Sequence, residues 1–176
     1  RRSRRVLRRT SCGSLWKKRR RESTGCIYEG VMYRLNAEDF SLELTPRVSQ
    51  ENSSYPEVNS LRVQVSSRGF SADSFMDVDD LHFAAFAVQL NELYETLKGS
   101  VRLEEPYSTH CFLEFIAAAG GHIHVKGNLH NKMGIGHAHE LTFENEFDQT
   151  YLRTFAKALF ADYGRYAEEI PNLLKG

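Results

Sequence analysis

Apolar and polar residues alternate in two segments of the first half of the chain, as half-buried strands require. Residues 41–45 (SLELT) and 61–66 (LRVQVS) both repeat with a period of two. Because successive side chains of a strand point to opposite faces, each segment predicts a strand with one buried and one wet face. We expect Pro46 to close the first strand, the polar stretch 49–60 to form a loop, and Gly69 to end the second strand.

Two later segments carry apolar residues at spacings of three and four, which predicts two amphipathic helices. The first spans 76–99, and Asp77, Asp79 and Asp80 are its N-cap candidates. The second follows Asp148, which is expected to cap it. The apolar stripes consist of Phe83, Phe86, Leu90, Leu93 and Leu97 in the first helix, and of Leu152, Phe155, Ala156, Leu159 and Tyr163 in the second.

Residues 101–143, between the two helices, are expected to form consecutive strands with short connections, which is typical of an antiparallel meander. In the last hairpin of this region, Ile123, Val125 and Leu129 form the apolar side of one strand. The whole pattern predicts an α+β fold, with a single antiparallel sheet of about six strands and both helices packed on one face. It also predicts a single domain over residues 26–176, without an internal repeat.

The formal net charge of zero hides an uneven distribution of charge. Residues 1–21 hold 11 of the 23 Lys and Arg and none of the 23 Asp and Glu, so residues 22–176 carry a net charge of −11. Such a field repels nucleic acid and attracts basic partners.

Residues 1–25 are polar almost throughout and allow three interpretations. They suit a basic arm for nucleic acid or localisation, an organellar transit peptide, or a non-native leader upstream of a start at Met32. We favour the leader, because the compact pattern begins directly after Met32. A solvated disordered tail is compatible with all three.

Histidines are concentrated in the hairpin before the second helix, with His122 and His124 on one strand and His137 and His139 on the return strand. A His-x-His pair on a strand can bind a metal ion, because alternate side chains share a side. The return-strand pair, however, falls on the apolar side of its strand, opposite the first pair. We therefore expect the two pairs not to converge on one ion.

Carboxylates are the other candidate functional groups. No two of them have the spacing of a catalytic acid and base, and the glycines form no phosphate-binding motif, so neither a catalytic residue nor a cofactor is predicted. Glu140 and Glu144 are expected to pair across the strands with His122 and His124. The acidic excess favours a surface for a basic protein partner. The residues assigned to this surface are Glu104, Glu105, Glu140, Glu144, Glu146 and Asp148.

The three cysteines are an odd number without a CxxC spacing, so we expect no disulfide framework and a reducing compartment, the cytoplasm. Cys111 lies in an apolar run and is predicted to be a small core residue. No apolar run is long enough to span a bilayer, so no membrane association is predicted.

The order of motifs from Phe40 to Tyr163 resembles the WapI-family immunity proteins of bacteria. These are small α+β domains with a signature G-x-I-x-V-x-G-x-L … L-x-F … D-Q-T-x-L-x-x-F. The most distinctive match is Asp148-Gln149-Thr150 before a Leu/Phe-rich helix. The matching segments are FSLEL (40–44), LRVQVSSRGFSAD (61–73), FAAFAVQLNEL (83–93), GHIHVKGNL (121–129) and HELTFENEFDQTYLRTFAKAL (139–159).

The resemblance implies a non-enzymatic function: binding and neutralising the toxic C-terminal domain of a contact-dependent or polymorphic toxin made by the same strain. Many such toxins are nucleases with basic surfaces, which an acidic inhibitor fits by mimicking phosphate. Two other functions stay open. One is a metal-dependent enzyme that uses the histidine-rich hairpin. The other is a nucleic-acid-associated protein that uses residues 1–21, since residues 26–176 are not expected to bind nucleic acid.

Overall fold

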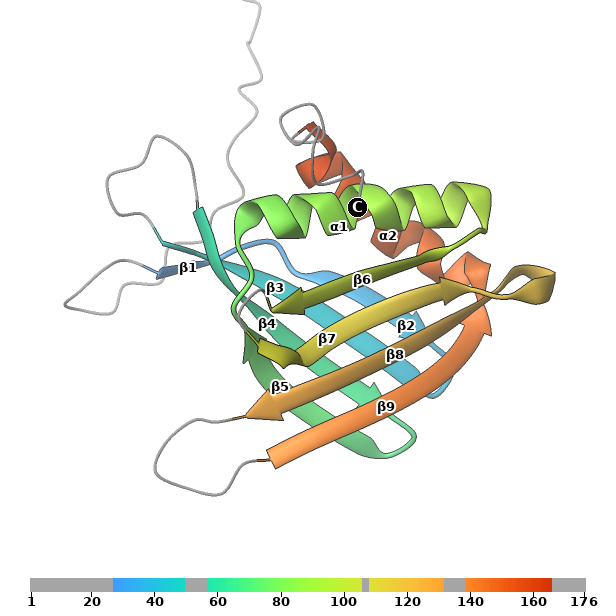
Figure 1. Cartoon of the computed structure of the whole chain (residues 1–176), viewed down its shortest axis with the longest axis horizontal. Coiled ribbons are helices and arrows are strands. Elements are labelled where there is room, and N and C mark those ends of the chain that lie inside the picture. The colour runs from blue at the N-terminus through green and yellow to red at the C-terminus, as the bar shows by residue number, and fades with distance from the viewer. Residues whose placement is uncertain (1–26, 50–56, 106–107, 132–138, 166–176) are drawn as a thin grey trace, which may run out of the picture.

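The computed structural model describes residues 27–49, 57–105, 108–131 and 139–165. They form two antiparallel sheets that face each other, with two helices lying together along one side (Figure 1). In sheet one the order is β1-β3-β4-β5, with β2 also paired to β3; in sheet two it is β6-β7-β8-β9. The strands are β1 (Ile27–Glu29), β2 (Tyr33–Ala37), β3 (Phe40–Ser49), β4 (Glu57–Ser67), β5 (Phe70–Met76), β6 (Ser100–Glu105), β7 (Ser108–Ala117), β8 (His122–Asn131) and β9 (His139–Asp148). The helices are α1 (Asp80–Thr96), α2 (Gln149–Tyr163) and a short 3₁₀ turn at Ala119–Gly121.

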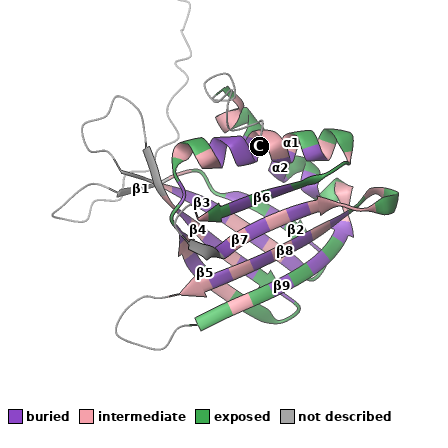
Figure 2. Ribbon diagram, viewed as in Figure 1, coloured by how far each residue is buried: buried purple, intermediate pink, exposed green. Residues whose placement is uncertain are grey.

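The α+β class, the two helices and the antiparallel connections are confirmed, but the prediction of a single sheet of about six strands is wrong. Each strand buries one face, as Leu42, Val63 and Val125 illustrate with 3% exposure or less. Buried positions recur along the strands of both sheets (Figure 2), and their side chains form one cluster, so the two faces pack against each other, sheet on sheet. The helices pack on each other and against β2 and β6, not on one face of a single sheet. A period of two predicts a buried face without specifying whether a helix or a second sheet covers it.

Strand β5 occupies part of a stretch that the sequence pattern did not assign. The first helix was predicted to begin at Met76, but Met76 is the last residue of β5 and is fully buried. Arg68 and Gly69, both with positive φ, turn the chain between β4 and β5, so the prediction that Gly69 ends a strand is confirmed.

Strand β3 does not end at Pro46 as predicted, and the expected loop 49–60 is shorter. β3 runs on to Ser49, and residues 57–60 already belong to β4, whereas residues 50–56 lie outside the described residues. On one side of β3, β2 pairs as far as Leu44 and β1 pairs from Arg47 onward. Pro46 falls in the gap between these two partners, so on that side its missing N–H interrupts no ladder.

Both predicted helix caps are confirmed. The Asp79 carboxylate accepts a hydrogen bond from the His82 N–H at 2.8 Å, and the Asp148 carboxylate accepts one from the Thr150 N–H at 2.8 Å. At the other end of α1, Leu97 rather than Gly99 closes the helix, with φ 52° and its N–H bonded to the Leu93 carbonyl at 2.8 Å. Because Asp148 is both the last residue of β9 and the cap of α2, the helix follows the histidine-rich hairpin without a connecting loop.

One continuous core joins the sheets and the helices. Phe115 of β7 lies between the rings of Phe86 in α1, at 6.0 Å, and Phe155 in α2, at 6.3 Å. The Tyr33 hydroxyl of β2 donates to the Asp162 carboxylate of α2 at 2.6 Å, and burial together with this carboxylate raises the pKa of Tyr33. Cys111 is buried, as predicted. Among the described residues, no helix is both long and apolar enough to cross a membrane.

Candidate functional site: the outer face of β8 and β9

The predicted site residues of the hairpin lie on the outer face of sheet two. In the register of β8 and β9, His122 lies opposite Asp148 and His124 lies opposite Glu146. Ile123, Val125 and Leu129 are buried on the inner face, so the histidines alternate outward as the sequence pattern predicts. The result is a two-stranded surface on which basic and acidic side chains face each other.

Short contacts join the histidines to the glutamates of β9. His124 Nε2 lies 2.5 Å from a Glu146 oxygen, and His122 Nδ1 lies 3.3 Å from the other. Glu144 lies 4.0 Å from His124 Nδ1, as predicted, and 3.6 Å from the Lys126 ammonium. Glu146 is therefore the main partner of both histidines, which the sequence pattern did not identify.

Glu140 makes a different contact from the one predicted. Its carboxylate accepts a hydrogen bond from the Asn128 side-chain amide at 2.5 Å. In the register it lies opposite His130, four residues along β8 from Lys126. The predicted contact of Glu140 with His122 or His124 is therefore wrong. The reason is the register: His122 and His124 pair with the far end of β9, at Asp148 and Glu146.

The candidate metal ligands are divided between two faces. His139 lies opposite Asn131 and shares the side of Leu141, whereas His122 and His124 point outward. His137 lies outside the described residues. In the part of the chain that the structure describes, no three His, Cys, Asp or Glu side chains are grouped so that they can hold a metal ion.

Of the remaining predicted partner-binding residues, Glu104 and Glu105 belong to β6, and Asp148 is the last residue of β9. Glu104, at the end of β6, contacts the Arg102 guanidinium at 2.7 Å, and Glu105 accepts the Asp77 N–H at 3.1 Å. Asp148 caps α2, and hydrogen bonds from the Thr150 hydroxyl and N–H lower the pKa of its carboxyl. Thus Glu140, Glu144, Glu146 and Asp148 share the outer face of β9, while Glu104 and Glu105 belong to β6, at the opposite edge of the sheet.

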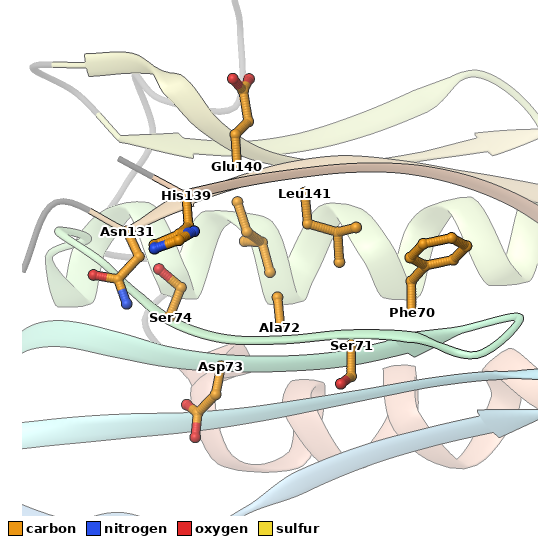
Figure 3. A pocket seen from close by; sticks show the side chains of 10 residues that line it. Phe70, Ser71, Ala72, Asp73, Ser74, Asn131, His139, Glu140 and Leu141 are labelled. Atoms are coloured by element: carbon orange, nitrogen blue, oxygen red, sulfur yellow. The ribbon is translucent and has the colours of Figure 1, made fainter. Parts of the chain in front are cut away.

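A pocket of about 360 Å³ opens between β5 and β9, and no sequence pattern pointed to it. Phe70 and Ala72 of β5 line one side, and Leu141 and His139 of β9 line the other (Figure 3). Ser74 donates to the His130 carbonyl at 3.0 Å and so ties the two sheets together at one end of the pocket. Predicting this pocket would have required both β5 and the packing of one sheet on the other.

These features define a small two-sheet α+β domain with a charged outer face and a hollowed edge. Residues 34–167 match the model of the Immunity protein WapI-like family, and the chain therefore belongs to that family. This confirms the resemblance found over residues 40–163. Immunity proteins of this kind are generally non-enzymatic. No curated protein matches the chain.

Proposed function

We propose that this protein binds and neutralises the toxic domain of a cognate bacterial toxin, and that it does so in the cytoplasm without catalysing a reaction. Its membership of an immunity-protein family supports the role, and the outer face of sheet two supports a site for it. The observation that carries the proposal is the row of Glu140, Glu144 and Glu146 on a single face of β9. The odd number of cysteines, without a CxxC spacing, is consistent with a reducing compartment.

The balance of charge on the outer face of sheet two supports a basic partner. One cross-strand row, formed by Arg102, Glu114, Lys126 and Glu144, alternates in sign and is largely self-neutralising. Counted over the described residues, however, this face carries six carboxylates against the two permanent cations Arg102 and Lys126. The six are Glu104, Glu114, Glu140, Glu144, Glu146 and Asp148. The excess lies along β9, at the edge of the sheet, where a partner has free access.

The two groups of predicted residues fit within one interface. Glu104 of β6 lies in the same cross-strand row as Phe112, Asn128 and Thr142, so three strand spacings separate it from β9. That distance is about 14 Å. A standard interface covers about 800 Å² on each partner, a patch roughly 28 Å across. A toxin domain seated on β9 therefore reaches the carboxylates of β6, and the acidic face attracts the basic groups with which a nuclease toxin holds phosphate.

The test uses the full chain and a catalytically dead form of the toxin domain encoded beside its gene. In the site variant Glu140, Glu144 and Glu146 are changed to Gln, and in the control Glu38, Glu92 and Glu95 are changed to Gln. The control residues are exposed and lie on other surfaces, so the two variants change the total charge equally. We expect the site variant to weaken binding by about tenfold or more and to reduce its salt dependence, and the control to retain nearly full affinity. Equal losses in the two variants would contradict the location of the site, and no binding by the native chain would contradict the function.

A further inference from the structure

The edges of the two sheets differ in how they are protected from pairing with another chain. Helix α2 packs against β2, and α1 packs against β6. β9 carries three glutamates on its outer face, a charge pattern that discourages pairing with another strand. Within the described residues, β5 pairs only with β4 and has no such cover. The free edge of β5 is therefore a place where sheet one can accept a further strand; β1, which also lies at an edge of this sheet, is only 3 residues long.

The composition of β5 fits an edge that pairs with a partner. Its sequence, FSADSFM, has no Lys and no Pro, and its single charged residue is Asp73. The Arg62 guanidinium of β4 holds that carboxylate with two hydrogen bonds, at 2.8 and 2.5 Å, and these lower its pKa. At the start of the strand, Phe70 is 70% exposed, the most exposed large hydrophobic side chain among the described residues. A strand edge with few charges and an exposed phenylalanine is a typical surface for pairing with another strand.

Hollows flank β5 on both of its sides. On the inner side lies the pocket of about 360 Å³, into which Phe70, Ala72 and Ser74 point (Figure 3). On the outer side lies a depression of about 330 Å³, lined by polar groups of Ser71, Asp73 and neighbouring strands. The side chains of an added strand alternate between these two sides. The inner pocket, between β5 and β9, therefore lies where such a strand would place its inward side chains, whereas the outer depression spreads over β3, β4 and β5 themselves.

We propose that β5 receives an extended segment of the toxin, which adds to sheet one as a further strand. This inference rests on the proposed function and specifies how the partner binds. Backbone hydrogen bonds to β5 provide the affinity, and the inner pocket, lined by Phe70, Ala72 and Leu141, selects apolar side chains on the inward side of the segment. Glu140 borders this pocket, but its side chain points to the outer face of β9 (Figure 3), where it accepts a hydrogen bond from the Asn128 amide and has no cation partner among the described residues. A toxin that also covers the outer face of β9 can therefore pair a basic residue with Glu140.

A second copy of this chain fits the same edge less well. Antiparallel pairing of two β5 strands about their centre brings Asp73 of one copy opposite Asp73 of the other. Like charges directly opposite each other destabilise a strand pair. A partner segment with a neutral residue at that position avoids this repulsion.

The test compares matched lysine substitutions at the two edges of sheet one. Ser71 of β5, Ser66 of β4, Ser41 of β3 and Asn36 of β2 lie in one cross-strand row, and Ser71 and Asn36 are both exposed. Ser71→Lys places a charge on the proposed docking edge, whereas Asn36→Lys places it on the edge packed against α2. We expect Ser71→Lys to weaken binding of the dead toxin domain by about tenfold and Asn36→Lys to leave it within about twofold. Phe70→Ala is expected to weaken it as well.

Amide hydrogen exchange of the full chain, free and in the complex, identifies the docked edge directly. We expect the amides of Phe70–Met76 to exchange more slowly in the complex, while those of β2 do not change. If the toxin binds and β5 shows no added protection, the strand proposal is overturned and the proposed function stands. If β5 becomes protected with rising protein concentration in the absence of toxin, the occupant is a second copy and the proposal is wrong. If the native chain does not bind the toxin, both proposals fail.

Discussion

Replacing Gly127 by Ala is expected to destabilise the fold, because this glycine makes room for an aromatic ring. Gly127 of β8 lies opposite Phe143 of β9. A Cβ atom at position 127 would lie 2.3 Å from Phe143 Cζ and 3.1 Å from a methyl carbon of Leu113. Phe143 is only 6% exposed, so its ring has little space into which to move.

The sign of the effect makes the prediction decisive. An ordinary Gly→Ala change at a compatible position stabilises a protein by about 0.4–1 kcal/mol, because it reduces the entropy of the unfolded chain. Overpacking a core costs about 1–3 kcal/mol. With a clash as close as the one at Gly127, the second effect dominates, and we expect a net loss of about 1–2 kcal/mol. For a domain of this size that corresponds to a fall in Tm of roughly 2–8 °C.

Urea unfolding followed by far-ultraviolet circular dichroism measures this loss. The control is Phe143→Leu, alone and combined with Gly127→Ala. The smaller leucine should relieve the clash, so the double variant should be more stable than the sum of the single effects by about 1 kcal/mol. A stabilising Gly127→Ala, or losses that simply add, would refute the packing argument.

Three further predictions concern stability. Asn145 and Ser67, both buried, exchange hydrogen bonds of 2.9 and 3.1 Å between the two sheets. Asn145→Ala should therefore lower the free energy of unfolding in urea by about 1–3 kcal/mol. Ser67→Ala should cost much less in the Asn145→Ala background than in the native chain. Asp79→Ala removes the cap of α1 and should cost about 1 kcal/mol, whereas Asp79→Asn should restore most of it. Burial raises the pKa of Asp79, but hydrogen bonds from His82 outweigh burial, so the pKa is lowered from 3.8. The ionised Asp79 therefore stabilises the fold above that pH, and this stabilisation should fade as the pH falls below it. An unfolding midpoint that is equally acid-sensitive in Asp79→Ala would contradict this prediction.

The sequence predicted those features that depend only on nearby residues, such as helix caps and the alternation of side chains along a strand. The caps Asp79 and Asp148 and the outward side of His122 and His124 follow from short-range chemistry and from the period of two. Strand β5 does not, because its FSADSFM sequence leaves Phe70 exposed and lacks a clean alternation. Its strand conformation depends on pairing with β4, a tertiary effect.

The candidate site shows the same division. The alternation identified the face of β9 that carries Glu144, but not that Glu146, rather than Glu140, lies beside the histidines. Which glutamate lies beside the histidines depends on the register of β8 and β9, which the hairpin connection determines. The pocket was unpredictable for a similar reason: Ala72 and Leu141 meet only because one sheet packs on the other.

The most direct test of the account is a titration of the active toxin domain with the full immunity chain, with residual toxin activity as the readout. A binding inhibitor abolishes activity at one chain per toxin, and activity returns when the complex is separated in high salt. That is the result we predict. Activity that is unaffected by an excess of the chain, or that is lost irreversibly at far less than one chain per toxin, would contradict neutralisation by binding.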